Sequence, residues 1–281
     1  MKLPAGFETA RVLAFLQART VGGLEAIGDG GYGRVVGWRG DHHWLELRFA
    51  RDGTAVRLVS SPALPGAVRR SLVNRMFDLE TDLTPFLRLA ARDPILRRLV
   101  RRRPGLRRQL LLDPFEAAVR AVVGQLISVP AATTLVSRLV AAFGTPLTWR
   151  PDTVAFPTPP RLLADPDRLG TIGLTKAKVA TLLSLAERSV ADGEFWSRLR
   201  RTPALADRAL GEISGIGPWT SAYIRYRGLA DPDAFPSTDL GIARALEGLG
   251  VSRPRIDAVT DRWRPWRALA VPHLWAAHLD E

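Results

Sequence analysis

One carboxylate and two aromatic rings lie close together in the last third of the sequence. Trp219 and Tyr223 are four residues apart, so both rings project from one face of a predicted helix. Asp239 follows Ser237 and Thr238 at a predicted helix start, where the helix dipole favours an ionised carboxylate. Such a carboxylate can stabilise positive charge in a transition state, and electron-rich rings attract a cationic ligand. Each residue alone also fits an ordinary role, the rings in a core and the aspartate as a helix cap.

The rings follow a glycine-rich turn that is part of a predicted helix–hairpin–helix at about residues 203–227. The first helix stops at Gly211, and Gly215-Ile-Gly217-Pro218 opens the second, with proline at its first position. The tight turn and the free N–H groups at this helix start suit one DNA phosphate. The predicted phosphate contacts are Gly215, Gly217 and Thr220. A helical hairpin with an ordinary glycine turn is the alternative.

The charge balance favours a polyanionic partner. Lys and Arg number 40 against 28 Asp and Glu, which leaves a net charge of +12. An excess of this size indicates nucleic acid first. Seven of the arginines lie between Arg97 and Arg108, where they form either a solvated helix face or a patch that faces phosphates.

Several kinds of site are excluded by composition. The chain has no cysteine, which removes disulfides, thiolate zinc sites and iron–sulfur clusters. The four histidines, at positions 42, 43, 273 and 278, are poorly spaced for a metal and are expected to be unligated. No apolar stretch reaches the roughly 18 residues that span a bilayer. No signal peptide opens the chain, so a soluble, cytoplasmic protein without membrane contact is expected.

A second glycine motif, Gly28 to Gly33, fits the G-x-G-x-x-G pattern of nucleotide-binding proteins. A dinucleotide site needs a strand before the motif and a helix after it, whereas here a helix is predicted before it and a strand after it. A kinase would need a lysine soon afterwards, and none lies between Lys2 and Lys176. These glycines are therefore assigned to a turn.

The elements that position these residues indicate an α+β protein. Three strands are predicted at Arg34–Trp38, Trp44–Arg51 and Thr54–Val59, and a helix follows at Pro65–Asp78. Alternation in the second strand predicts that one of its faces is buried. Helices dominate from about residue 83 onwards. One of them begins at Asp113-Pro114 and places Phe115, Val119, Val122 and Leu126 on a stripe that predicts burial.

The pattern L-x-x-I-x-G-I-G-x-W-T at the hairpin, followed by P-x-x-D, resembles the helix–hairpin–helix DNA glycosylase superfamily. Within it, the chain is similar to the bacterial DNA-3-methyladenine glycosylase II family, the AlkA type, over nearly its whole length. The other segments that carry the resemblance are Leu16–Ile27, Arg75–Leu79, Phe115–Val129, Phe156–Pro159, Arg262–Arg267 and His273–Trp275.

The resemblance implies a small N-terminal antiparallel sheet with helices, similar to the TATA-binding fold, followed by two all-helical domains. We expect an N-terminal α/β domain at residues 1–90 and one helical domain made of residues 91–114 and 232–281. The second helical domain, residues 115–231, contains the hairpin, and the active cleft is expected between the two.

By the same resemblance, Asp239 is the catalytic aspartate, and the base pocket is lined by Trp219, Tyr223, Trp275 and Phe15. Leu126 is the wedge that fills the gap left by a flipped nucleotide, with Gln125 beside it; from the helical stripe alone, Leu126 fits a core position equally well. The family's hairpin often holds a monovalent cation, Na⁺ or K⁺, through main-chain carbonyls, here those of Gly211, Ile213 and Ile216. No metal or other cofactor is expected at the reaction centre. A well-known member has an aromatic residue where this chain has Leu240.

The implied function is excision of alkylated bases such as 3-methyladenine from double-stranded DNA by a monomeric enzyme that initiates base excision repair. An alternative is a non-catalytic helix–hairpin–helix protein that binds damaged DNA, which would need neither Asp239 nor the aromatic pair. A third is a bifunctional glycosylase/lyase, which needs a lysine two residues after Gly217, where this chain has Trp219. The enzyme is therefore expected to have no lyase activity.

Overall fold

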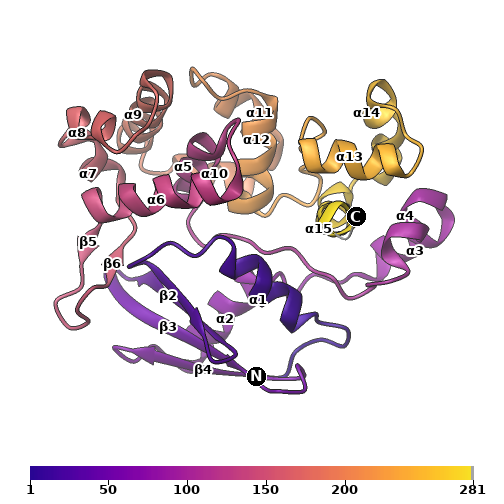
Figure 1. Ribbon diagram of the computed structural model, residues 1–281, viewed down its shortest axis with the longest axis horizontal. Helices are drawn as coiled ribbons and strands as arrows, with labels where there is room; N and C mark the ends of the chain where they lie inside the picture. The colour runs from indigo at the N-terminus through magenta and orange to yellow at the C-terminus, as the bar shows by residue number, and fades with distance from the viewer. Residues whose placement is uncertain (280–281) are drawn as a thin grey trace.

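A four-stranded antiparallel sheet and two helices form the N-terminal part of the computed structural model, which describes residues 1–279 (Figure 1). The strands pair in chain order and are β1 (Glu25–Gly28), β2 (Gly31–Trp38), β3 (Asp41–Phe49) and β4 (Val56–Ser61). The helices are α1 (Thr9–Gln17) and α2 (Gly66–Met76). Both helices contribute to one apolar cluster with the sheet, so the small domain has its own core.

The predicted alternation in the second strand holds on one face of the sheet only. Leu45 and Leu47 are fully buried in the core of the N-terminal domain, as expected. Trp44 on the opposite face is also buried, because it packs in the core of the helical domain and Arg150 lies over its ring at 4.2 Å from the centroid. The prediction of a single buried face is therefore wrong. Gly33 has no side chain to collide with the Trp44 ring that crosses it.

The glycine motif that resembles a nucleotide-binding loop is a hairpin turn, but the element before it differs from the prediction. β1, not a helix, leads into the motif and ends at Gly28, and β2 follows from Gly31. Asp29 and Gly30 form the turn with positive φ angles of 48° and 71°. A strand of four residues is too short to show its period in the sequence. No helix follows the motif, so the dinucleotide assignment remains excluded.

The first helical domain is built around α5, which lies in the middle of a large apolar cluster. Asp113 caps this helix by accepting a hydrogen bond from the main-chain N–H of Phe115 at 2.8 Å. The helices are α5 (Pro114–Gly124), α6 (Val129–Phe143), α7 (Pro159–Leu163), α8 (Pro166–Thr171), α9 (Lys176–Ala191), α10 (Phe195–Arg201), α11 (Pro203–Gly211) and α12 (Pro218–Ile224), which continues as a π-helix, Arg225–Leu229. Two short strands, β5 (Thr145–Pro146) and β6 (Val154–Ala155), pair beside the N-terminal sheet.

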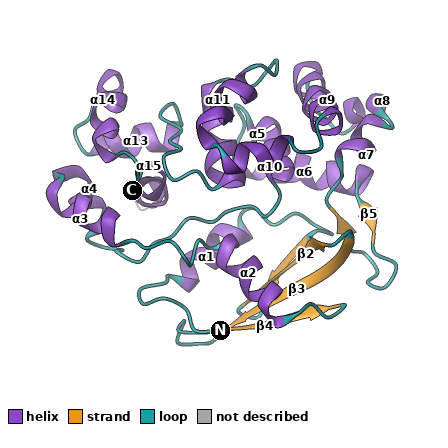
Figure 2. Ribbon diagram, turned by 180° about the vertical axis from the view of Figure 1, so that it is seen from behind, coloured by secondary structure: helices purple, strands orange, loops and turns teal. Residues whose placement is uncertain are grey.

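The second helical domain joins two segments that are far apart in the sequence (Figures 1 and 2). Its helices are α3 (Thr84–Arg92), α4 (Pro94–Val100), α13 (Leu240–Gly248), α14 (Ile256–Thr260) and α15 (Arg267–Leu279), with 3-10 turns at Arg253–Arg255 and Asp261–Trp263. Leu83 and Phe86 are buried in this cluster together with Leu246 and Leu269. The chain thus leaves the N-terminal core before the predicted boundary at residue 90. Residues 280 and 281 of the predicted domain 232–281 lie outside the described residues.

Two arginines of the basic segment Arg97–Arg108 point into the protein. Arg108 forms a buried ion pair with Asp78 at 2.6 Å and donates to the main-chain oxygens of Ala230 and Asp231. Arg107 donates to the main-chain oxygen of Asp78 at 2.6 Å. These two side chains join the domains, so the segment is neither wholly a solvated face nor wholly a phosphate-facing patch. Over residues 1–279, no helix is long and apolar enough to cross a membrane.

Candidate active site

The Asp239 side chain is held by four N–H donors at the start of α13. Its Oδ1 accepts hydrogen bonds from the main-chain N–H groups of Gly241 and Ile242 at 3.0 and 3.1 Å. The same oxygen accepts a bond from Trp275 Nε1 at 3.1 Å, and Oδ2 accepts one from Trp219 Nε1 at 3.0 Å. Asp239 is therefore a helix cap and also a half-buried carboxylate whose orientation is fixed by donors from three helices, α12, α13 and α15.

A cavity of about 370 Å³ opens in front of this carboxylate. Trp219, Tyr223 and Trp275 line it together with Asp239. The rings of Trp219 and Tyr223 stack at a centroid distance of 5.2 Å, and that of Trp275 lies 6.4 Å from Tyr223. The volume lies within the range of sites for small molecules. The expected pocket residues are thus brought together, although Trp275 lies 52 residues after Tyr223 in the sequence.

Another wall of the cavity joins residues of the N-terminal domain to residues of α5 and the π-helix, and it carries positive charge. Phe15, on α1, lines the cavity as expected, but Arg19 lies over its ring at 3.9 Å from the centroid. The Arg227 guanidinium lies 5.0 Å from the same centroid, and Arg120 also lines the wall. Leu240, which stands where an aromatic residue was noted in a relative, is half exposed at the rim. No spacing in the sequence indicated that these arginines meet.

Arg120 also belongs to a buried network of four charged side chains. The other three are Glu25, Arg34 and Glu116. Glu116 on α5 accepts hydrogen bonds from Arg34 at 2.7 Å and from Arg120 at 2.9 Å. Glu25 pairs with Arg120 at 3.1 Å and accepts a hydrogen bond from Tyr32 at 2.9 Å. Burial alone would raise the pKa of Glu25, but the two guanidiniums and these hydrogen bonds outweigh it and hold that pKa below its ordinary value. The network ties the N-terminal sheet to α5, and no motif in the sequence predicted it.

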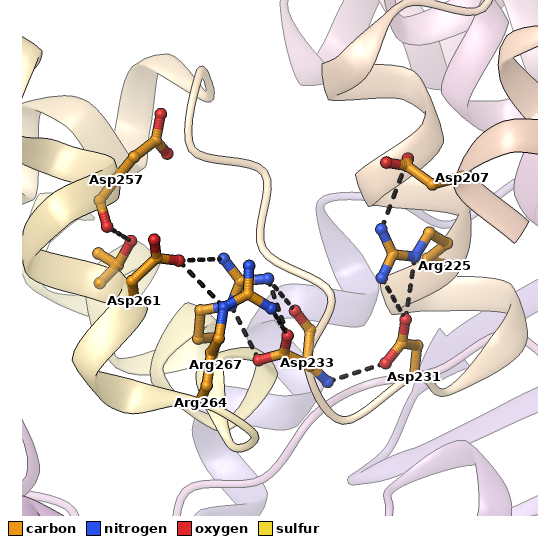
Figure 3. Close-up of polar contacts among 9 residues, drawn as sticks. Asp207, Arg225, Asp231, Asp233, Asp257, Asp261, Arg264 and Arg267 are labelled. Atoms are coloured by element: carbon orange, nitrogen blue, oxygen red, sulfur yellow. Dashed lines mark hydrogen bonds and ion pairs between the residues drawn. The ribbon is translucent and has the colours of Figure 1, made fainter. Parts of the chain in front are cut away.

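The linker that leads from the π-helix to Asp239 is clamped at two points (Figure 3). Arg225 donates two hydrogen bonds to Asp231, at 2.9 and 2.7 Å. Asp233 is held by Arg267, which donates to both of its carboxylate oxygens at 2.9 Å and also to its main-chain oxygen. Arg264 binds the same carboxylate. These ion pairs, of which Arg267–Asp233 is bidentate, fix the path of the chain between the two helical domains and so help to position the carboxylate at its end.

Leu126 lies outside the core. Its side chain is fully exposed, at 104%, in a residue with a φ of +58°, which excludes the core position suggested by the helical stripe. Gln125 beside it donates from Nε2 to Gly215 O at 2.9 Å and to Thr220 Oγ1 at 2.8 Å. Lys178 Nζ donates to Val123 O and Gln125 O at 2.8 and 2.9 Å. The loop that presents Leu126 is therefore braced by α9 and by the hairpin.

The hairpin between α11 and α12 has the geometry that its glycines predict. Gly215 has a φ of +88°, and the Thr181 hydroxyl fills the space that a Cβ would need. Thr220 is buried and its hydroxyl accepts the hydrogen bond from Gln125, so its side chain does not face the predicted phosphate. Ile213 O accepts the N–H of Ile216 at 3.1 Å and keeps a second lone pair. Carbonyl oxygens suit a hard cation, so the donor set of Gly211, Ile213 and Ile216 fits the predicted Na⁺ or K⁺.

Comparisons with known proteins agree with this architecture. A family model described as the AlkA N-terminal domain matches residues 2–109. The chain is 35% identical to a Mycobacterium tuberculosis protein named "Probable bifunctional transcriptional activator/DNA repair enzyme AlkA", over 98% of this chain and 56% of that protein, so it spans about half the length of that relative. It is 31% identical to Escherichia coli "DNA-3-methyladenine glycosylase 2", over 96% of this chain and 93% of that one.

Among solved structures, the fold matches that of a 3-methyladenine DNA-glycosylase from Archaeoglobus fulgidus. The TM-score is 0.83 at 21% sequence identity, and the match covers 99% of this chain and 97% of the other. The predicted α+β fold class and the predicted family are both confirmed. The chain belongs to the AlkA-type DNA-3-methyladenine glycosylase family.

Proposed function

We propose that this protein is a monofunctional DNA glycosylase, which flips alkylated bases such as 3-methyladenine out of duplex DNA and hydrolyses the N-glycosidic bond. The observation that carries the proposal is the Asp239 carboxylate, fixed by four N–H donors at the edge of an aromatic cavity. The glycosidic bond of a stacked nucleotide is inaccessible, so such an enzyme must extrude its target. Family membership and the names of the relatives support the same activity.

Two steps of the reaction follow from the side chains around the cavity. Alkylation at a ring nitrogen makes a base cationic, and rings such as Trp219 and Tyr223 favour a cationic ligand by about 0.5–2 kcal/mol each. As the base departs, the sugar becomes positively charged at C1′, and the fixed negative charge of Asp239 stabilises it. Among the described residues, Oδ2 accepts only the Trp219 bond, so it is the oxygen with capacity left to orient the attacking water.

The DNA is held, in this proposal, from the side of the exposed loop. Leu126 occupies the gap in the duplex, with Gln125 beside it, and the hairpin N–H groups of Gly215, Gly217 and Thr220 bind a phosphate. A monovalent cation on the hairpin carbonyls would supply a further positive charge towards that phosphate. The net charge of +12 supports a duplex DNA partner, and the enzyme would act as a monomer.

We further propose that the strand is left intact. The lysine that a lyase uses on the second hairpin helix is replaced by Trp219, whose indole N–H is engaged with Asp239. Lys178 lies beside the loop of Leu126, where its ammonium group donates to two main-chain carbonyls. Water is then the nucleophile that completes hydrolysis.

The decisive experiment measures base release from methylated duplex DNA, with the free bases identified by chromatography. Asp239→Asn should lower release at least about a hundredfold, the usual scale for removal of a preorganised charge. Asparagine also caps helices, so the variant should fold and still bind DNA that carries an abasic-site mimic. Asp165→Asn, at the cap of α8 and outside the cavity, is the matched control and should keep wild-type rates. DNA binding by the wild type without base release would support the non-catalytic alternative instead.

Strand cleavage is tested on the same reactions. The product strand should run intact on a gel until heat or alkali cleaves it, and borohydride added during turnover should trap no protein–DNA adduct. Trapping that disappears in Lys178→Arg would show that this lysine forms a Schiff base and that the enzyme is bifunctional.

A further inference from the structure

Arg19 places a positive charge in the wall of a cavity that is proposed to receive cationic bases. The residue follows α1, and its guanidinium carbon lies over the Phe15 ring at 3.9 Å from the centroid. Nη1 donates to the main-chain oxygen of Phe15 at 3.3 Å. The side chain is half-buried and lines the same cavity as Asp239 and the three aromatic rings.

Unlike Arg120, Arg19 forms no ion pair with a carboxylate among residues 1–279. Arg120 pairs with Glu25 and Glu116, so its charge is balanced within the protein. Burial lowers the pKa of the Arg19 guanidinium below its ordinary value; Arg227 and Arg120 act in the same direction, whereas Tyr223 and Asp239 act against it. Most of its five N–H groups remain available to a ligand, because the Phe15 oxygen takes only one of them.

The charges around the cavity limit which group of a ligand Arg19 could bind. A cation beside the pocket repels a cationic base, so attraction of charge cannot be the role of Arg19. A phosphate in the cavity would lie beside the carboxylate of Asp239, which repels it. A carbonyl oxygen on the base remains as the acceptor that a guanidinium recognises well.

We propose, on the basis of the function proposed above, that Arg19 is a specificity-determining residue that donates a hydrogen bond to O6 of a flipped alkylguanine. Guanine presents a carbonyl at position 6, whereas adenine presents an amino donor there, which a guanidinium cannot bind. When the glycosidic bond breaks, its electron pair passes into the purine ring, and part of that density reaches O6. The hydrogen bond from Arg19 therefore strengthens in the transition state, and release of alkylguanine is favoured relative to alkyladenine.

Duplex DNA treated with dimethyl sulfate tests this directly, because it contains both 3-methyladenine and methylated guanines. Arg19→Met should lower the ratio of methylguanine to 3-methyladenine released at equal enzyme by about tenfold, the scale of one lost hydrogen bond to a charged donor. Both products come from one sample, so the ratio does not depend on the fraction of folded enzyme. Arg57→Met, on an exposed part of β4, removes the same charge and should leave the ratio unchanged.

Arg19→Lys keeps a charged donor and should retain part of the wild-type ratio, which loss of a purely structural contact would not do. Arg19→Leu replaces the methionine variant if that protein does not fold; leucine also lacks a donor, so the ratio should again fall. The proposal is wrong if neutral variants change both products equally or leave the ratio within twofold of wild type. If the wild type releases neither base, the proposed function itself fails.

Discussion

Loss of the Glu116 charge should destabilise the protein far more than loss of a surface carboxylate. Glu116 and Arg34 form an ion pair at 2.7 Å, and their side chains are only 2% and 4% exposed. With Arg120 and Glu25 the group is neutral, so Glu116→Gln leaves two buried guanidiniums and one carboxylate. Breaking a buried pair in this way costs about 3–5 kcal/mol. We expect the lower end, about 3 kcal/mol, because glutamine keeps one carbonyl acceptor in place.

Glu46→Gln is the matched control, because it breaks a pair of the same kind at the surface. The Arg48–Glu46 distance is 2.6 Å, but these side chains are 62% and 31% exposed. An exposed pair contributes only about 0–1 kcal/mol, so this variant should unfold almost as the wild type does. The comparison isolates burial, since residue types and distances are nearly the same.

Urea unfolding at neutral pH, followed by tryptophan fluorescence and circular dichroism, measures both variants. A double variant, Arg34→Met with Glu116→Leu, leaves the balanced pair of Arg120 and Glu25. Its loss of unfolding free energy should be smaller than the sum of the losses of Arg34→Met and Glu116→Leu measured singly, by at least about 1 kcal/mol. The reasoning is refuted if Glu116→Gln and Glu46→Gln unfold at the same urea concentration, or if the two single changes simply add.

Three further outcomes follow from individual side chains. Leu126→Ala should change stability by less than about 0.5 kcal/mol, because the side chain is fully exposed, yet lower base release; an unchanged rate would contradict the wedge. Lys178→Met should slow base flipping, measured with a fluorescent base beside the lesion, more than Lys176→Met, because it frees the two carbonyls behind that loop. Burial, with the charge of Arg103, lowers the pKa of His273 to about 4. In the unfolded chain this histidine has a pKa of about 6.5, so as pH falls it binds a proton there before it does so in the folded protein. The contribution of neutral His273 to the free energy of unfolding is therefore complete above about pH 6.5 and is lost as pH falls through 4. His273→Gln should show a weaker pH dependence of unfolding than the wild type over this range, and equal dependence would refute the assignment.

Local spacing was enough to find half of the candidate site. The four-residue interval of Trp219 and Tyr223, the glycines of the hairpin and the position of Asp239 at a helix start are visible in the sequence, because caps and helix faces depend on neighbours a few residues away. The buried stripe of α5 was visible for the same reason. The same spacing wrongly allowed a core position for Leu126, because regular spacing of apolar residues does not show that the helix ends at Gly124.

The other half depends on contacts between segments that are far apart in the chain. Trp275 donates to Asp239 across 36 residues, and Arg19 reaches the cavity from the N-terminal domain. The pairing of Glu25 and Arg34 with α5, and the packing of α3 against the C-terminal helices, are of the same kind. No period or motif encodes such contacts, because they arise only when separately formed elements bury their apolar faces against one another. The sequence by itself determined the family, the fold class and the aromatic side of the pocket, and the tertiary structure decided that arginines form its other wall.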